Sequence, residues 1–288
     1  HSTYWNDCQF SVTLCLVFVK NKKMKIWANT IVNNEENFIW FALMSVIDFV
    51  DQILVYDTGS TDKTVEIIKE IQKNKKNKII LKEVGQSDGN EFPKLRQKML
   101  DESKCDWIIV LDGDEIWWEN SIKKLINKIN KEGNKIEGII VPMIVSVGDI
   151  YHLQEENAGQ YNLLGRRGHL SLRAINKKIS GLHVDWPYGK ESYLDLSNQP
   201  IQEIERIIFL DAPYLHVTHL KRSNSKRKAD KFKYELGDKV SEEFKFPEIL
   251  FKHYPLIIHS PWTKISGFDL TLAATLTPLR KINRRLRR

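Results

Sequence analysis

Two aspartates in the middle of the chain are spaced so that they could act together. Asp112 and Asp114 flank Gly113 and follow the apolar run 108–111, which is typical of a buried parallel strand. Open α/β sheets bind ligands at the ends of such strands, and the glycine allows a tight turn that brings both carboxylates toward one point. Such a point suits Mg2+ or Mn2+ bound to a diphosphate. An Asp-Gly turn that caps the next helix is the alternative, and the motif alone does not decide between them.

The elements that would position this turn can be predicted from apolar periodicity. The pattern predicts strands at 26–32, 52–56, 79–84, 107–111 and 136–147, and helices at 36–50, 62–73, 93–103 and 121–131. Strands and helices therefore alternate. This order predicts an α/β fold with a Rossmann-like open twisted sheet flanked by helices.

The regular alternation fails beyond Gly148. Residues 149–168 are polar and contain three glycines, as in a long functional loop. We predict a strand at 169–175, a second apolar strand within 207–217, and a charged helix at 225–236 that Gly237 ends. The sequence contains neither an internal repeat nor a linker that would divide it.

Charge and cysteine content exclude some classes of protein. The chain has a formal net charge of +7, but six basic residues lie within 280–288, so the remainder is close to neutral. This argues against a nucleic-acid-binding surface. Cys8, Cys15 and Cys105 form neither a disulfide framework nor a metal-ligand spacing, which favours a reducing, cytoplasmic location. The apolar segment 8–19 is too short to span a bilayer and lacks the positive start of a secretion signal.

Three motifs give the chain a resemblance to a known family. N-N-E-E at 33–36 follows the first predicted strand, Y-D-T-G-S-T-D-K-T at 56–64 follows the second, and L-D-G-D-E at 111–115 ends the fourth. In this order they resemble the family 2 glycosyltransferases of the GT-A fold, which carry a DxD motif. The resemblance covers the first half of the chain, and R-A-I-N at 173–176 resembles a later strand of that family.

The resemblance implies a nucleotide-sugar donor, either a UDP- or a GDP-sugar, and a divalent cation, Mn2+ or Mg2+. In the family, the acid that ends the second strand contacts the nucleobase, and a basic residue on the helix before the DxD strand approaches the nucleotide. The second aspartate of the DxD pair usually binds the metal, and the first meets the ribose or metal-bound water. The implied donor-binding residues are Thr30, Asn33, Glu35, Asp57, Arg96 and Asp112, and the implied metal ligands are Asp112 and Asp114.

The implied reaction needs a base as well as a cation. A cation stabilises the charge that develops on the leaving diphosphate, and a carboxylate on the opposite face of the sugar can deprotonate the acceptor hydroxyl, which gives inversion. The family's usual Glu-Asp pair is absent. Asp185 is our first candidate because it adjoins Trp186, whose ring suits a sugar face on the acceptor side. The acids in this half are Asp149, Glu155, Glu156, Asp185 and Glu191, of which Glu155 and Glu156 rank next.

Two histidines and two tryptophans are further candidates. His216 and His219 end an apolar run, and in a strand their spacing of three places them on opposite faces. We therefore expect at most one of them to reach the metal, and a structural role for both is the alternative. Trp117 and Trp118 follow the acidic turn and either stack on a sugar on the acceptor side or pack in the core. Arg222 either meets the diphosphate or lies in a solvated turn.

The resemblance divides the chain into segments. Residues 1–23 are unassigned, 24–147 form a nucleotide-sugar-binding half, 148–240 an acceptor and catalytic half, and 241–288 a C-terminal extension. That extension carries an apolar stripe among basic residues and suits peripheral membrane contact at an anionic leaflet, whereas a frayed soluble tail is the alternative. Pro278 would force a helix there to restart. The stripe consists of Leu272, Leu276, Leu279, Ile282 and Leu286.

These observations predict a cytoplasmic, metal-dependent, inverting glycosyltransferase, active at the inner face of the membrane if the tail binds there. It would use a glycan or lipid-linked acceptor in cell-surface glycan or glycolipid synthesis. A nucleotidyltransferase of related fold is one alternative, but it would need a glycine-rich phosphate loop after the first strand, where the chain has N-N-E-E. A module that binds nucleotide or glycan without catalysis is the other.

Overall fold

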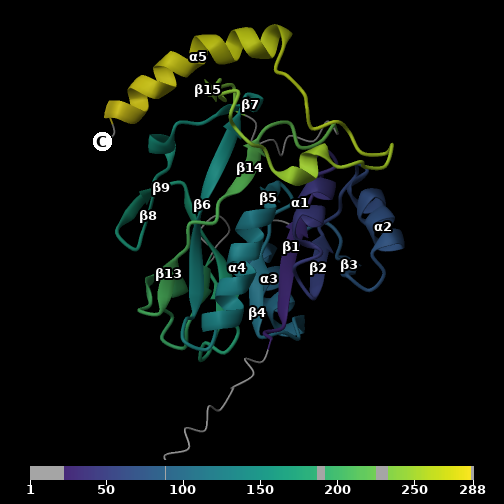
Figure 1. Ribbon diagram of the computed structural model, residues 1–288, viewed down its shortest axis with the longest axis vertical. Helices are drawn as coiled ribbons and strands as arrows, with labels where there is room; N and C mark the ends of the chain where they lie inside the picture. Colours follow the sequence, from purple (N-terminus) through teal and green to yellow (C-terminus); the bar gives the residue numbers. More distant parts are fainter. Residues whose placement is uncertain (1–22, 88, 187–191, 225–232, 287–288) are drawn as a thin grey trace, which may run out of the picture.

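A computed structural model describes residues 23–87, 89–186, 192–224 and 233–286. A large sheet of eleven strands runs through the centre of the molecule, and helices flank it (Figure 1). The predicted α/β class and the open, flanked sheet are confirmed. Residues 1–22, within the segment that the sequence left unassigned, lie outside the described part of the chain.

The first half of the chain forms the parallel part of the sheet. Its elements are β1 (Ile26–Val32), α1 (Ile39–Val46), β2 (Gln52–Asp57), α2 (Thr64–Asn74), β3 (Ile79–Glu83), α3 (Phe92–Glu102), β4 (Trp107–Val110), β5 (Glu115–Trp117) and α4 (Glu119–Glu132). β4, β1, β2 and β3 run parallel in this order. Residues of α1, α2 and α4 pack with one face of these strands, and Met99 of α3 packs with the other. Because both faces are covered, β1 and β4 are buried along their whole length.

The second half adds mixed strands to the β4 edge. β10 pairs antiparallel with both β4 and β6, and β13 and β14 run parallel to β6, so the sheet has the order β15-β7-β6-β10-β4-β1-β2-β3. β11 and β12 form a separate hairpin, as do β8 and β9. The elements are β6 (Gly138–Val147), β7 (Asp149–Leu153), β8 (Tyr161–Leu163), β9 (Arg166–Gly168), β10 (Leu170–Asn176), β11 (His183–Asp185), β12 (Ser192–Leu194), β13 (Ile207–Phe209), β14 (Tyr214–His219), β15 (Asp238–Lys239) and α5 (Gly267–Leu286).

Three predictions for this half differ from the structure. Residues 149–168, predicted to be one long loop, contain the strands β7, β8 and β9, because β7 pairs with β6 and β8 pairs with β9. The apolar run 207–217 is not one strand: it is divided between β13 and β14, because the chain leaves the sheet around Pro213, which has no N–H to donate. The predicted helix 225–236 lies largely outside the described residues, and 233–236, which are described, are not helical.

α5 is one helix and lies across the end of the sheet, beside β7 and β15 (Figure 1). The prediction that a helix would have to restart at Pro278 is wrong, because α5 continues through it. The proline removes one N–H donor, and contacts on both sides hold the helix in place. The Leu236 N–H donates to Thr277 Oγ1 at 2.7 Å, and Arg284 bonds Glu155 at 2.8 Å. The tail is therefore a packed helix and not a frayed segment.

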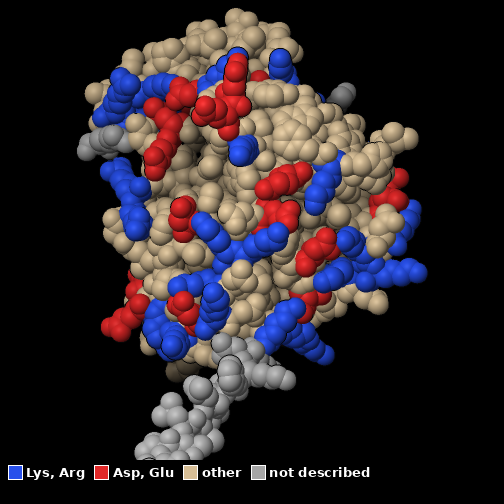
Figure 2. All heavy atoms as spheres, in the orientation of Figure 1, with Lys and Arg blue, Asp and Glu red and all other residues tan. Residues whose placement is uncertain are grey.

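The surface carries charges of both signs. On the face shown in Figure 2, basic and acidic side chains are interspersed and form no extended patch of one sign. None of the helices in the described part of the chain combines the length and the apolar character that a membrane crossing requires.

The two adjacent tryptophans have structural positions. Trp117 is 1% exposed and stacks on Tyr214, with ring centroids 5.2 Å apart, because β5 pairs with β14 in that register. Trp118 donates its indole N–H to the Lys245 carbonyl and packs edge-on against Phe244. Neither residue lines the large cavity described below, and their contacts match the alternative that they pack in the fold. Trp117 packs β5 against β14, and Trp118 connects the start of α4 to residues 244–245.

Trp117→Ala should lower the free energy of unfolding by roughly 3–5 kcal/mol, because it leaves a large void beside Tyr214. Trp118→Ala is the matched control. Its side chain is only partly buried, and we expect about 1 kcal/mol for the lost hydrogen bond and a smaller loss of packing. Urea unfolding followed by circular dichroism measures both. Equal losses in the two variants would contradict this assignment.

Candidate active site

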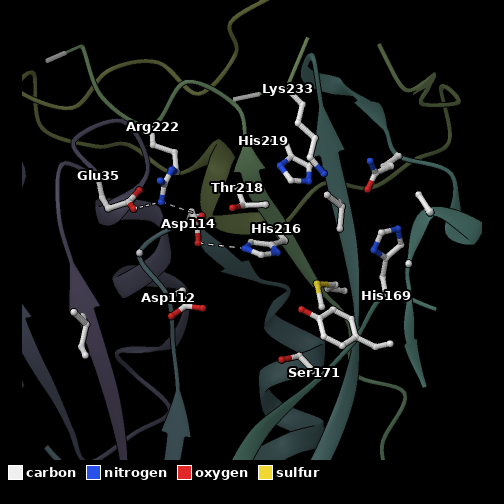
Figure 3. Close-up of a pocket in the computed structure, with 18 of the residues that line it drawn as sticks. Glu35, Asp112, Asp114, His169, Ser171, His216, Thr218, His219, Arg222 and Lys233 are labelled. Atoms are coloured by element: carbon white, nitrogen blue, oxygen red, sulfur yellow. Dashed lines mark hydrogen bonds and ion pairs between the residues drawn. The ribbon is translucent and has the colours of Figure 1, made fainter. Parts of the chain in front are cut away.

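A cavity of about 1520 Å3 opens where β1 and β4 end (Figure 3). Its walls come from β1, from the turn after β4, and from β6, β10 and β14, and α5 closes one end. Residues on both sides of position 148 therefore meet around one space. This volume exceeds what a drug-sized ligand usually needs, so it has room for more than one reactant.

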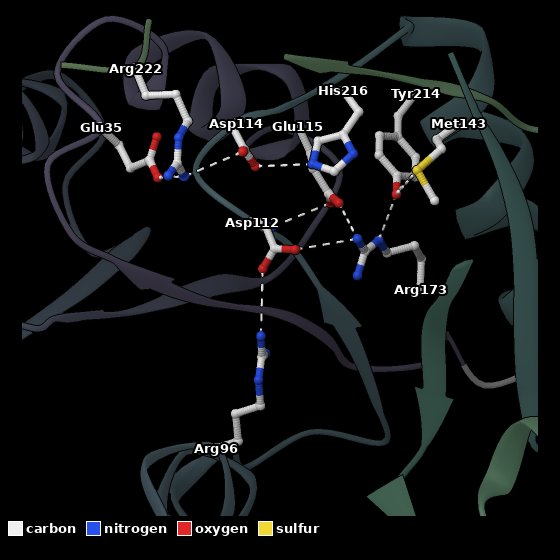
Figure 4. A network of polar contacts seen from close by, with 10 residues as sticks. All are labelled: Glu35, Arg96, Asp112, Asp114, Glu115, Met143, Arg173, Tyr214, His216 and Arg222. Carbon is white, nitrogen blue, oxygen red and sulfur yellow. Dashed lines mark hydrogen bonds and ion pairs between the residues drawn. The ribbon is translucent and has the colours of Figure 1, made fainter. Parts of the chain in front are cut away.

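The Asp-Gly-Asp turn lies in this cavity, and arginines contact both of its carboxylates (Figure 4). Asp112 lies 3.6 Å from Arg96 and 3.3 Å from Arg173. Asp114, 3% exposed, lies 3.5 Å from Arg222. Although burial opposes it, the attraction of Arg173 and then Arg96 holds the pKa of Asp112 below its usual range. Asp112 is therefore charged at neutral pH.

Arg173 of β10 is a site residue that sequence reasoning missed. It is buried, and it bonds Glu115 as well as Asp112 and the Tyr214 hydroxyl, the last at 3.1 Å. Burial raises the pKa of Glu115 to about 7, although Arg173 attracts its charged form. The R-A-I-N motif pointed to this strand. Nothing in the sequence pointed to the partners of the arginine.

The two histidines of β14 both line the cavity (Figure 3). The prediction that they face opposite sides is wrong, because the pairing of β14 with β6 shifts register between His216 and His219, and the bulge cancels the alternation. His216 Nε2 lies 3.4 Å from Asp114 Oδ1. Burial, the largest single effect, lowers the pKa of His216, but the charge and hydrogen bond of Asp114 together with the charge of Glu115 outweigh it and raise the pKa above the ordinary value.

Only some of the residues predicted to bind the donor line the cavity. Asn33, Glu35 and Arg96 line the cavity together with Asp112, whereas Thr30 is wholly buried on β1 and does not line it. Asp57, also buried, accepts hydrogen bonds from the amides of Gly59 and Ser60 through Oδ2, both at 3.0 Å. Its Oδ1 has no hydrogen-bond partner among the described residues. Arg222, from the turn after β14, binds Glu35, which follows β1, and so joins these two walls of the cavity.

The candidate bases are spread around the cavity. Glu155 bonds Arg284, and Glu156 is exposed. Asp185 is exposed at the end of β11 and accepts a hydrogen bond from the Trp186 N–H. None of these residues is among the described residues that line the large cavity, and neither are Asp149 and Trp186. Glu191 lies outside the described residues.

The side chains around the turn match a divalent cation in type but are not arranged around one. Asp112, Asp114 and His216 offer carboxylate oxygens and an imidazole, which suit Mn2+. In the described part of the chain, no three His, Cys, Asp or Glu side chains converge in a metal-binding arrangement. The arginines carry the positive charge that balances these carboxylates in the structure, and His216 lies against Asp114.

The sequence model of glycosyl transferase family 2 matches residues 30–211, which is more than half of the chain. The chain belongs to glycosyl transferase family 2. The resemblance seen in the sequence is thereby confirmed. The family match includes the Asp-Gly-Asp turn and Arg173 but ends before β14 and α5.

Solved structures of glycosyltransferases are similar to this family 2 chain. One is S. aureus TarS 1-349 with UDP-GlcNAc, at 17% identity and a TM-score of 0.49 over 74% of this chain and 63% of that one. Another is the mannosyltransferase PcManGT from Pyrobaculum calidifontis with GDP-Man and Mn2+, at 14% identity and 0.44 over 72% and 59%. A third is glucosyl-3-phosphoglycerate synthase from Mycobacterium tuberculosis with Mn2+, UDP and phosphoglyceric acid, at 15% identity and 0.42 over 67% and 70%. The chain thus spans less than two thirds of the TarS structure, and no curated protein matches it in sequence.

Glu115→Gln should change how stability depends on pH. The pKa of Glu115 is about 7 in the fold and 4.5 without it, so the folded state keeps a proton that the unfolded chain has released. Stability from this group is therefore present below pH 4.5 and is lost as pH rises toward 7, by at most about 1.4 kcal/mol per pH unit. The stability advantage of wild type over Glu115→Gln should fall across that window. Urea unfolding in EDTA at several pH values measures it, with exposed Glu66→Gln as the control. A difference that does not vary with pH would refute the assignment.

Proposed function

We propose that this chain is a metal-dependent, inverting glycosyltransferase that moves a sugar from a UDP- or GDP-sugar to an acceptor hydroxyl. One observation carries the proposal. The Asp-Gly-Asp turn of a family 2 chain lies at the end of β4, inside a cavity that residues from both halves of the chain line. In an open α/β sheet, this is the edge where ligands bind.

The donor occupies the side of the cavity near β1 and α3. Asn33, Glu35 and Arg96 line it there, and Asp57 ends the neighbouring strand β2. Asp57 Oδ1 lacks a partner among the described residues and is able to accept a hydrogen bond from a nucleobase N–H. Because Thr30 is wholly buried, it takes no part in this proposal.

Asp112, Asp114 and His216 would hold Mn2+ or Mg2+. His219, the fourth predicted ligand, lines the same cavity. When bound, the cation supplies positive charge to the departing diphosphate. Arg96, Arg173 and Arg222 lie against the same carboxylates and can exchange them for phosphate oxygens, which bind guanidinium groups in the same geometry. In this way the residues of the chain orient the leaving group.

Asp185 remains our first candidate for the base, although it is not among the residues that line the large cavity. Its hairpin packs against α3, where the Val184 N–H donates to Gln97 Oε1 at 2.7 Å, and α3 carries Arg96 into the cavity. Glu155 is less suitable because its carboxylate is already paired with Arg284. Removing a proton from the acceptor hydroxyl on the side opposite the leaving group produces inversion.

The acceptor is a glycan or lipid-linked sugar, used in cell-surface glycan synthesis. α5 supports a location at the inner face of a membrane. Its exposed apolar side chains, Phe268, Leu279, Ile282 and Leu286, recur at helical spacing, and the exposed Arg285 lies beside them. An apolar stripe with basic neighbours suits the surface of an anionic leaflet.

Asp114→Asn should abolish Mn2+-dependent binding of UDP or GDP, because an amide is a poor replacement for a carboxylate ligand. Calorimetric titration with Mn2+ and again with EDTA measures this. Asp211→Asn, exposed and away from the cavity, is the matched control and should bind as wild type does. Nucleotide binding that Mn2+ still enhances in Asp114→Asn would remove this residue from the metal site.

Asp185→Asn should keep donor binding and lose transfer by roughly 10²- to 10⁴-fold, which is the usual size of general-base assistance. Sugar transfer to an acceptor panel, with nucleotide release as the readout, measures the loss. Glu155→Gln and Glu156→Gln are the comparisons. If either of these loses transfer while Asp185→Asn keeps it, the base is that glutamate.

A further inference from the structure

One end of the cavity carries more positive than negative charge. At the Asp-Gly-Asp end, the carboxylates Glu35, Asp112 and Asp114 line the cavity with three arginines, so charges balance. At the α5 end, three cations line it with one carboxylate. These cations are Lys233, Arg280 and Arg284, and the carboxylate is Glu235. This end, which we call the α5 subsite, lies outside the residues that the family model matches.

The α5 subsite is held in place by its own contacts. Glu235 is 2% exposed and bonds Arg284 at 2.6 Å, with Arg280 at 3.8 Å. Arg284 also bonds Glu155. These contacts fix the two arginines of α5 at the cavity wall, so the helix is a part of the site and not merely a cover over it.

Lys233 is the cation with the fewest partners. Its side chain is half-buried and extends into the cavity beside His219, with His169 across the space (Figure 3). Among the described residues, none forms an ion pair or hydrogen bond with its ammonium group. Burial lowers its pKa, and the charges of Arg280 and Arg284 lower it further although Glu235 opposes them. An anion bound here would offset that repulsion.

We propose that the α5 subsite binds a phosphate group of the acceptor, through Lys233, Arg280 and Arg284. This inference rests on the proposed transferase function and names the class of acceptor. Three cations against two carboxylates, Glu235 and the Glu155 that pairs with Arg284, leave one positive charge to balance, and a phosphate group supplies negative charge at pH 7. Guanidinium groups bind phosphate oxygens in pairs, and an ammonium adds a point charge. The donor diphosphate is served by the arginines at the other end.

The test compares phosphorylated and unphosphorylated probes in variants of the α5 subsite. sn-Glycerol 3-phosphate and glycerol are titrated by calorimetry into wild type, Lys233→Gln, Arg280→Gln and Lys281→Gln. Lys281 is the matched control, because it lies next to Arg280 on α5 but pairs with Asp238 outside the cavity. We expect wild type to bind glycerol 3-phosphate but not glycerol. The affinity for glycerol 3-phosphate should fall about tenfold in Lys233→Gln and in Arg280→Gln, and it should stay unchanged in Lys281→Gln.

A second arm identifies the source of the phosphate. Vesicles of phosphatidylcholine with phosphatidic acid are sedimented with the same four proteins. If binding to these vesicles requires Lys233 and Arg280, the phosphate belongs to a lipid. If only the binding of glycerol 3-phosphate requires these two residues, the phosphate belongs to a soluble molecule or a glycan. If neither probe binds, or if Lys281→Gln weakens binding as much as the other variants do, the inference is overturned.

Titration of UDP and GDP with Mn2+ into the same samples separates this inference from the proposed function. If glycerol phosphate binding depends on Lys233 but no nucleotide binds, the phosphate site stands and the transferase proposal fails. If a nucleotide binds and glycerol phosphate binds equally well to every variant, the transferase proposal stands and the phosphate site fails. Thermal unfolding of each variant shows whether it is folded.

Discussion

The site depends on one buried charge, the guanidinium of Arg173. It contacts the Asp-Gly-Asp-Glu turn through Asp112 and Glu115, and it reaches β14 through the Tyr214 hydroxyl. A buried charge is tolerated only when it is paired and hydrogen-bonded, so each of these partners is needed. Three carboxylates within four residues would also repel one another without a cation among them. Arg173 therefore fixes β4, β10 and β14 relative to one another at the point where chemistry is expected.

In the proposed function, the same pairing would make donor binding and metal binding depend on each other. Asp112 and Asp114 must give up arginine contacts to hold a cation, and those arginines then need a new anion. In the proposed function, a nucleoside diphosphate would supply that anion, and Asp112 and Asp114 would hold the cation in place of the arginines. Each ligand would thus remove the free-energy cost of leaving charges unpaired that the other ligand would cause by binding alone. The two binding events would therefore be positively coupled. For this reason, the proposed metal-dependent transfer is compatible with a structure whose described residues do not already converge as metal ligands.

The sequence predicted the parts of the fold that local pattern controls. β1 to β4 and the helices between them follow from apolar periodicity, and the strand-end motifs placed Asp112 and Asp114 at the right edge. The errors arose where tertiary contacts override local rules. A bulge in β14 brought His219 to the face of His216, pairing of β5 with β14 buried Trp117, and ion pairs held α5 intact through Pro278. None of these contacts has a signal in the neighbouring sequence.

The same difference between local pattern and tertiary contact separates the two ends of the cavity, which our proposals assign to the donor and to the acceptor. The donor end is built from strand ends and turns whose motifs can be recognised, and the family match covers most of it. The acceptor end is assembled from Lys233, Glu235 and α5, which are far apart from β6 and β10 in sequence and meet them only in the fold. Ala273 is the one buried residue of α5, so the inward-facing charges of this helix contact Glu235 and Glu155 and not the apolar core. Acceptor choice can therefore vary while the donor site stays fixed, and the inward-facing side chains of α5 are where such variation would alter the acceptor.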